Sequence, residues 1–205
     1  PAAARNVGIR EARSEIILFT DDDIIPAPTL VAQHLDWHRK FPDPATAMQG
    51  YVTWSAEVRP TPFMKWYGLD GALFSYAHFV KRQALDYRYF YTCNVSLKTD
   101  FMRRHGTFDE DFKVAAYEDI ELGYRLGKAG MRLLYNPAAM GYHQQYISFD
   151  DACSRYRKAL AAGEVFRKKE GGMHYYSSQP GRPSRLKQRF RKEISTILWP
   201  LKRLT

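Results

Sequence analysis

Three consecutive aspartates, Asp21-Asp22-Asp23, stand where a short apolar run, Ile16-Ile17-Leu18-Phe19, comes to an end. A β-branched and aromatic run bounded by polar residues is typical of a buried strand. Side chains alternate along a strand, which puts Asp21 and Asp23 on one side and Asp22 on the other. Adjacent carboxylates repel one another unless a cation offsets the repulsion, and hard divalent cations such as Mg²⁺ bind carboxylate oxygens. The triplet therefore indicates either a divalent metal site or a solvated acidic turn.

Further motifs follow the triplet, and one precedes it, in a fixed order along the chain. They are Ala3-Ala4-Arg5-Asn6-Val7-Gly8, Asn94-Val95-Ser96-Leu97-Lys98, Gly106-Thr107-Phe108-Asp109-Glu110-Asp111-Phe112, Glu118-Asp119-Ile120-Glu121, Gly130 to Tyr135, and His143. With the triplet, this ordered set resembles the second half of a family 2 glycosyltransferase of the GT-A fold. The resemblance covers roughly residues 1–165.

Strand-like and helix-like stretches alternate along the chain. We expect strands at 16–20, 47–54, 89–97 and 132–135, and helices at 5–13, 29–40, 99–105, 118–128 and 149–169, with Thr29 and Thr99 as caps and an irregular aromatic stretch at 60–85. Strands interleaved with helices favour an α/β fold with a mostly parallel sheet. The resemblance narrows this to a GT-A, Rossmann-like sheet with flanking helices.

Length and composition allow one domain, because 205 residues with 45% hydrophobic content can bury a sizeable core. GT-A domains begin with strand–helix units that cradle the nucleotide, and nothing here resembles the first of these strands. We therefore expect an N-terminally truncated domain that lacks the upstream part of the donor site. Residues 1–170 would form the C-terminal two-thirds of that domain, and 171–205 a basic linker and amphipathic tail.

Positive charge is concentrated at the end of the chain. Residues 1–154 carry a net charge of −2 and residues 155–205 a net charge of +11. Six basic residues in 182–192 precede an apolar segment, 194–201, that contains Trp199. This pattern fits an interfacial helix on an anionic membrane or a solvated extension, and no nucleic-acid-binding motif accompanies the charge.

Two features bear on where the protein resides. No apolar run approaches the length of a membrane-spanning helix. Cys93 and Cys153 give neither a disulfide framework nor the spacing of a metal site, which favours a reducing compartment. We expect a cytoplasmic protein, peripheral at the inner face of the cell membrane.

The candidate metal ligands are acidic residues and one histidine. We expect Asp23 to bind the cation, Mn²⁺ or Mg²⁺, directly, with Asp21 holding the ribose or the water shell of the metal. The resemblance implies that His143 completes the metal or diphosphate site. Asp22, which faces the other way, is the weakest of the donor-binding candidates.

Other candidates come from the resemblance to family members. Arg5 and Asn6 match a stretch that lies against the nucleotide, and a planar guanidinium suits a diphosphate or a base carbonyl. Asn6 is equally consistent with a structural role that ties its helix to the sheet. Trp54 and Asn94 match positions on the acceptor side, where Trp54 would stack on a sugar ring or belong to the core.

Glu118 and Asp119 open a predicted helix, where acidic residues are stabilised by the helix dipole without any catalytic role. The resemblance implies instead that Asp119 is the general base and that Glu118 orients the acceptor or the base. An acceptor hydroxyl is a poor nucleophile until a positioned carboxylate takes its proton. Glu121 and Arg125, one helical turn apart, are expected to form an ordinary surface pair.

The resemblance implies an inverting, metal-dependent transferase that moves a sugar from a nucleotide-sugar donor to a glycan or lipid-linked acceptor. The Gln-x-x-Arg-Trp motif of processive synthases is missing, since the corresponding residues are Gln144-Gln145-Tyr146 and, later, Arg155-Tyr156. Transfer of a single sugar is therefore favoured. Two alternatives stay open: a non-catalytic glycan- or nucleotide-binding relative, and a metal-dependent nucleotidyltransferase.

Overall fold

The computed structural model describes residues 2–69, 73–74, 76–79 and 84–177 of the 205-residue chain. The helices are α1 (Ala2–Glu11), α2 (Leu30–Lys40), α3 (Pro62–Leu69), α4 (Thr99–His105), α5 (Glu118–Lys128), α6 (Phe149–Lys168) and α7 (Glu170–Ser177). The strands are β1 (Ile16–Thr20), β2 (Ile24–Pro26), β3 (Thr46–Trp54), β4 (Ala84–Leu85), β5 (Asn94–Lys98) and β6 (Arg132–His143). Three 3₁₀ turns connect them, η1 (Ala56–Val58), η2 (Tyr76–His78) and η3 (Tyr87–Tyr89).

The described strands form one sheet in the order β1-β5-β3-β6-β2, with β4 also paired to β6. Among these strands β3 and β6 are the parallel pair, and the other pairs are antiparallel. The mixed α/β layering that we expected is therefore present. The expectation of a mostly parallel sheet is wrong for this part of the molecule.

Helix–strand alternation does not fix the direction of pairing, which explains the error. A parallel neighbour requires a connection that returns the chain to the same end of the sheet. Between β3 and β6 the long stretch from residue 55 to residue 131 makes such a return. The much shorter path from β1 through the aspartate turn leads directly into β2, which pairs with the carboxyl end of β6.

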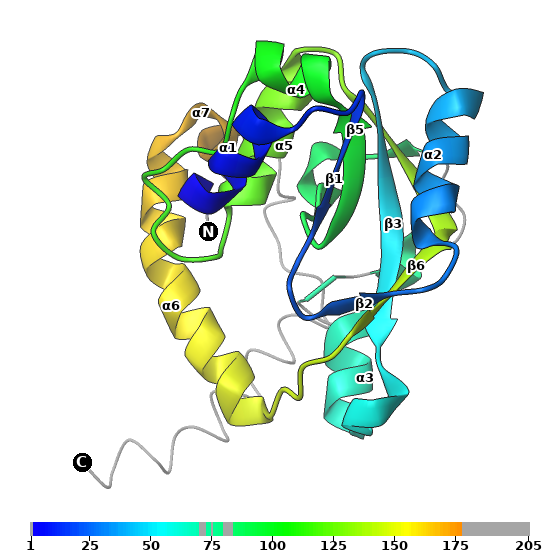
Figure 1. Ribbon diagram of the computed structural model, residues 1–205. Helices are drawn as coiled ribbons and strands as arrows, with labels where there is room; N and C mark the ends of the chain where they lie inside the picture. The colour runs from blue at the N-terminus through cyan, green and yellow to red at the C-terminus, as the bar shows by residue number, and fades with distance from the viewer. Residues whose placement is uncertain (1, 70–72, 75, 80–83, 178–205) are drawn as a thin grey trace, which may run out of the picture.

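Helices cover both faces of the sheet (Figure 1). Helices α1, α4 and α5 lie on one side, whereas α2 lies on the other against β3 and β6. The main core fills the interface between the sheet and α1, α4 and α5 with buried side chains, among them Phe19, Val95, Leu97, Met102, Phe108, Leu122 and Leu126. A second, aromatic cluster includes Tyr76, Phe79 and Tyr135, and a third, with Phe112 and Phe166, joins α6 to the body.

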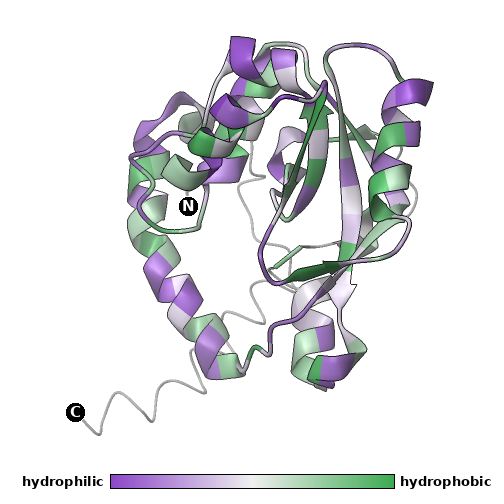
Figure 2. Cartoon of the chain, in the orientation of Figure 1, coloured by the Kyte–Doolittle hydropathy of each residue, from purple (hydrophilic) through white to green (hydrophobic). Residues whose placement is uncertain are grey.

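The middle of the sheet is less apolar than its position would suggest. Figure 2 shows that β3 is much less hydrophobic than β2, although β3 lies between β5 and β6. Thr46 and Gln49 of β3 and Asn94 and Ser96 of β5 are all buried. The side chains of Gln49, Asn94 and Ser96 are hydrogen-bonded, as buried polar groups generally are, whereas Thr46 Oγ1 has no partner among the described residues.

Most predicted elements are confirmed, with shifts at their ends. The strand at 16–20 and the helix at 118–128 have the expected bounds, whereas the predicted strand at 89–97 begins only at Asn94 and the one at 132–135 runs on to His143. The irregular stretch at 60–85 contains α3. Neither expected cap forms: Thr29 makes no side-chain cap, and the hydroxyl of Thr99 donates to the Ser14 carbonyl at 2.7 Å.

The packed part of the chain extends past the expected boundary at residue 170. Gly171 and Gly172, expected in a linker, are buried in α7, which packs on α5 and α6. The basic and apolar segments at 182–192 and 194–201 lie outside the described residues. Within the residues described here, no helix combines the length and hydrophobicity needed to cross a membrane.

Truncation of a buried leucine should lower the stability of the protein far more than truncation of an exposed one. Leu97 is 0% exposed between β1 and β3, and Leu160 on α6 is 56% exposed. We expect Leu97→Ala to lower the free energy of unfolding by about 2–5 kcal/mol, because it leaves a cavity. Leu160→Ala should change it by about 0.5 kcal/mol or less. Urea unfolding measures both, and equal losses would contradict the position of this core.

Candidate active site

The aspartate triplet forms the turn between β1 and β2, at the carboxyl end of β1. The amide of Ile24 donates to the carbonyl of Asp21 at 3.3 Å, which closes the turn. Asp21 and Asp23 are partly buried and Asp22 is exposed. Asp21 and Asp23 meet different partners, so the triplet does not act as one cluster.

Arg5 of α1 connects the first of these aspartates to the start of α5. Its guanidinium donates to Glu118 Oε1 at 2.8 Å and to Asp21 Oδ1 at 3.2 Å, and it lies 5.4 Å from the ring centre of Phe108. The Glu118 side chain is only 4% exposed. Although burial alone would lower the pKa of Arg5, the bonded Glu118 carboxylate holds it above its ordinary value. Arg5 is thus engaged by two protein carboxylates.

Asp119 follows Glu118 in the first turn of α5 and is half-buried. Burial, and then the charge of Glu118, raise the pKa of Asp119 to about 7, while Arg5 opposes the shift. The residue before the pair, Tyr117, has a φ of 68°, a left-handed conformation that is unfavourable for a tyrosine. Such backbone strain is common at functional sites.

Asp23 faces His143 on the other side of the turn. Asp23 Oδ2 and His143 Nε2 are 3.5 Å apart, which is long for a hydrogen bond. The pairing of β2 with β6 sets Ile24 opposite His143 and so fixes this approach. Burial lowers the pKa of His143, an effect that the Asp23 carboxylate partly offsets.

Two buried atoms of this pair lack hydrogen-bond partners, namely Asp23 Oδ1 and His143 Nδ1. Unsatisfied buried polar atoms are uncommon and call for an explanation, such as an ion. A carboxylate is a ligand that Mn²⁺ and Mg²⁺ favour, and an imidazole is a common ligand of transition-metal ions. However, the described residues contain no cluster of three or more His, Cys, Asp or Glu side chains that could hold a metal. Asp21, expected to hold the ribose or the water shell of the metal, is bonded to Arg5.

Trp54 stands beside His143 at the end of β3. The two rings meet edge to face with their centres 5.0 Å apart, and the indole N–H donates to the Met64 carbonyl at 2.6 Å. A cavity of about 90 Å³ lies here, lined by Tyr51, Val52, Thr53, Trp54, Lys65, Gly68, Phe74 and His143. Trp54 is therefore partly exposed to a cavity next to the Asp23–His143 pair.

Two asparagines among the candidates have interior roles: Asn6 has the structural role that was one of its two alternatives, whereas Asn94 differs from the acceptor-side position expected for it. Asn6 is 3% exposed, and its amide donates to Phe108 O and Glu110 Oε1 and accepts from Phe108 N. Asn94 is 1% exposed and also has both ends of its amide in hydrogen bonds. Both side chains are used inside the protein, so Asn94 does not line an open acceptor surface and Asn6 serves structure.

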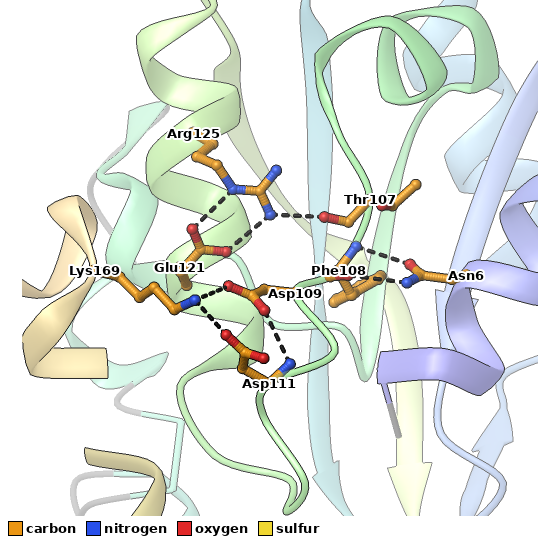
Figure 3. Close-up of polar contacts among 8 residues, drawn as sticks. All are labelled: Asn6, Thr107, Phe108, Asp109, Asp111, Glu121, Arg125 and Lys169. Carbon is orange, nitrogen blue, oxygen red and sulfur yellow. Dashed lines mark hydrogen bonds and ion pairs between the residues drawn. The ribbon is translucent and has the colours of Figure 1, made fainter. Parts of the chain in front are cut away.

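The loop at 107–111 is attached to α1, to α5 and to Lys169 between α6 and α7, as Figure 3 shows. Asn6 holds Phe108, and Arg125 of α5 donates to the Thr107 carbonyl at 2.7 Å. Lys169, just after α6, lies 2.7 Å from Asp109 Oδ2 and 2.6 Å from Asp111 Oδ2. These contacts fix Phe108 beneath Arg5 and thereby support the ion pairs of the site.

Most of this support was not predictable from the sequence. Glu121 and Arg125 form the expected pair, but Glu121 is buried and Arg125 also binds the loop, so the pair is no ordinary surface contact. The Phe-Asp-Glu-Asp run at 108–111 was the available signal for the loop. No sequence signal pointed to Lys169, because it belongs to a basic stretch and its partners lie about 60 residues away.

Replacing Arg5 should expose the dependence of the site on its charge. We expect Arg5→Gln to cost about 3–5 kcal/mol of unfolding free energy, because it leaves the buried Glu118 carboxylate unpaired. The double variant Arg5→Gln/Glu118→Gln should regain most of that loss.

Arg39→Gln is the matched control, because Arg39 pairs with Asp36 on the surface, where the two side chains are 76% and 66% exposed. Its effect should stay below about 1 kcal/mol. A loss for Arg5→Gln no larger than for this control, in urea unfolding, would remove the central role given to Arg5.

The sequence and the fold are both similar to those of known glycosyltransferases. The family described as Glycosyl transferase family 2 matches residues 1–108. A validoxylamine A glucosyltransferase of Streptomyces hygroscopicus subsp. jinggangensis is 30% identical over 162 residues, which cover 68% of this chain and 38% of that protein. The chain spans about half, or less, of the length of the curated relatives it matches.

Two solved structures share the GT-A fold with this chain. The mannosyltransferase PcManGT from Pyrobaculum calidifontis, in complex with GDP-Man and Mn²⁺, has a TM-score of 0.54 at 19% identity and covers 95% of this chain and 48% of its own. GalNAc-T7, with UDP, GalNAc and Mn²⁺, has a TM-score of 0.53 at 16% identity and covers 94% of this chain and 40% of its own. At these identities the likeness shows the fold.

Proposed function

Because the chain belongs to glycosyltransferase family 2, we propose that it transfers a single sugar from a nucleotide-sugar donor to a hydroxyl of a glycan or lipid-linked acceptor. We further propose that the transfer inverts the anomeric centre and depends on a divalent metal. The observation that carries the proposal is the position of Asp119, a half-buried carboxylate next to the buried Glu118 in the first turn of α5, where burial raises its pKa to about 7. A general base is most effective when its pKa lies near the working pH.

Asp119 takes the proton of the acceptor hydroxyl in the proposed reaction. The acceptor oxygen forms a bond to the anomeric carbon while the bond from that carbon to the diphosphate oxygen breaks. The bonding electrons leave with the nucleoside diphosphate, and the proton stays on Asp119. Glu118, which is buried and bound to Arg5, orients the helix start rather than the acceptor.

Asp23 and His143 suit the leaving-group end of the site. They present a carboxylate and an imidazole 3.5 Å apart, with one unpartnered buried atom on each side chain. We propose that they hold Mn²⁺ or Mg²⁺, which when bound supplies positive charge toward the departing diphosphate. The solved structures with GDP-Man or UDP also contain Mn²⁺, which supports a divalent cation for this fold.

Trp54 and its cavity suit the acceptor side. The partly exposed indole is held by Met64 and lies against His143, so an acceptor sugar stacked on it would be close to the proposed metal ligands. Single transfer, rather than chain elongation, is supported by the sequence, in which Tyr156 follows Arg155. Arg155 donates a hydrogen bond to Gln145, which follows His143 closely in the chain. The region that differs from processive synthases therefore contacts the segment next to His143.

Replacing the proposed base should remove turnover without unfolding the protein. We expect Asp119→Asn to lower kcat by at least about 100-fold, while nucleotide binding persists. In the wild type, kcat should rise with pH through about 7, because Asp119 must lose its proton to act. Asp100→Asn, at the exposed first turn of α4, is the control. Near-normal turnover by Asp119→Asn would exclude Asp119 as the base.

The same variant has a stability signature. The pKa of Asp119 is raised above its unfolded value, so the folded state binds the proton more tightly and loses stability as pH rises from about 4 through about 7. Asp119→Asn lacks this loss. Its melting temperature relative to wild type should therefore be higher at pH 8 than at pH 5, and thermal unfolding at the two pH values measures the difference. An identical offset at both would contradict the raised pKa.

Metal dependence should follow the Asp23–His143 pair. We expect Asp23→Asn and His143→Gln each to raise the Mn²⁺ concentration for half-maximal turnover by roughly 10- to 100-fold, as changes at a metal site commonly do. Asp36→Asn on the outer surface of α2 should leave it unchanged. Activity that resists a chelator, or unaltered Mn²⁺ dependence in both variants, would argue against this metal site.

A further inference from the structure

The parallel pairing of β3 with β6 changes register in the middle of the sheet. Thr46 to Gly50 pair with Arg132 to Asn136 one to one, but Tyr51 then pairs with Met140. Three residues of β6, 137–139, therefore have no opposite residue on β3. On the other edge of β3, the pairing with β5 ends at Gln49 and Val95, next to the same point.

The side chain of Asn94 occupies this discontinuity. Its Nδ2 donates to the Tyr51 carbonyl at 3.1 Å and to the Ala139 carbonyl at 2.9 Å, one on each strand. A Cβ atom at Gly50 would collide with the Asn94 amide and with the Ala139 carbonyl. The glycine thus leaves room for a side-chain bridge where the backbone ladder is interrupted.

Helix α2 holds the other end of the amide. His34 Nε2 lies 2.8 Å from Asn94 Oδ1, and His34 Nδ1 lies 2.7 Å from Ser96 Oγ. Ser96 Oγ in turn lies 2.8 Å from His38 Nε2. Burial lowers the pKa of each histidine to about 4, so both are neutral near pH 7.

The donors and acceptors available on each side chain fix the direction of every hydrogen bond in this chain. The Asn94 amide nitrogen donates to two carbonyls, so its oxygen must accept from a protonated His34 Nε2. A neutral His34 then has a lone pair on Nδ1, which accepts from the Ser96 hydroxyl. Ser96 Oγ consequently accepts from His38 Nε2–H. The chain runs in one direction, from α2 to the interrupted strands.

The segments beyond the discontinuity carry one half of the proposed site. Tyr51 to Trp54 of β3 line the cavity, and Trp54 pairs with His143 of β6. Ile24 also pairs with His143 and so brings Asp23 to it. A different register at residues 51 and 140 would move His143 away from both Trp54 and Asp23.

We propose that Asn94 is a positioning residue for the reaction proposed above, acting through the register of β3 and β6 rather than by touching a substrate. Its amide, clamped by His34, holds the two strands in the shifted register. That register places His143 beside Asp23. The proposal depends on the proposed function only for its catalytic consequence, because the positions of Trp54 and His143 can be measured in the absence of turnover.

The test compares Asn94→Asp with Ser96→Ala in the intact protein. Asn94→Asp keeps an oxygen for His34 but supplies at most one donor for the two carbonyls. Ser96→Ala breaks the same hydrogen-bond chain on the far side of His34 and spares the bridge. Both should lower the melting temperature. Only Asn94→Asp should move the NMR signals of the Trp54 indole N–H and the His143 ring, and raise the Mn²⁺ concentration for half-maximal turnover about tenfold with a smaller effect on kcat.

Unmoved Trp54 and His143 signals in a folded Asn94→Asp variant would overturn the proposal, and so would equal displacements in Ser96→Ala. If melting curves show that Asn94→Asp does not fold, Gly50→Ala replaces it in the test, because the added methyl group would collide with the Asn94 amide. The same shifts of the Trp54 and His143 signals are expected. If the wild type shows no transfer with any donor, the proposed function fails, and the NMR comparison still decides whether Asn94 positions His143.

Discussion

The guanidinium of Arg5 is the interaction on which the acidic half of the site depends. It joins α1 to a nearby carboxylate after β1 and to another, 113 residues from Arg5 in the chain, at the start of α5. Because Asp119 follows Glu118 in the first turn of α5, the ion pair between Arg5 and Glu118 also fixes the position of Asp119. Without the cation, the buried Glu118 would be left as an unpaired charge, which is among the most destabilising changes a protein interior can undergo. The loop at 107–111 holds Phe108 beneath Arg5, and its own attachments to Asn6, Arg125 and Lys169 therefore serve the same purpose.

The other half of the site depends on strand register instead of charge. His143, Trp54 and Asp23 come together because β2, β3 and β6 pair beyond the discontinuity at Gly50. The proposed base thus belongs to a helix start held by ion pairs, and the proposed metal ligands belong to a sheet held by a buried amide. A transfer reaction needs its base and its leaving-group stabiliser at fixed positions relative to each other. The core cluster around Val95 and Leu97 packs against the first half, and a separate cluster with Ile24, Val52 and Tyr135 packs against the second.

Local sequence signals predicted much of this arrangement. The apolar run at 16–19 and the acids after it gave the strand and the turn, and the Glu-Asp pair gave the start of α5. The direction of strand pairing could not be read this way, because it depends on how each connection crosses the sheet. The interior roles of Asn6 and Asn94 were hidden for a related reason: a buried amide is recognisable only once its partners, 102 and 43 residues away, are known. Asp21 and Asp23 have different partners because Arg5 binds Asp21, and the alternation of side chains along a strand does not reveal where Arg5 lies.

The products of the reaction test the central claim most directly. The intact protein should be incubated with UDP-, GDP- and dTDP-sugars and a hydroxyl acceptor panel, with Mn²⁺ or with chelator. We expect release of nucleoside diphosphate from one donor, dependent on the metal, and a product whose anomeric configuration, read by NMR, is opposite to that of the donor. Release of pyrophosphate would instead indicate a nucleotidyltransferase, and retained configuration would contradict a single displacement with Asp119 as base.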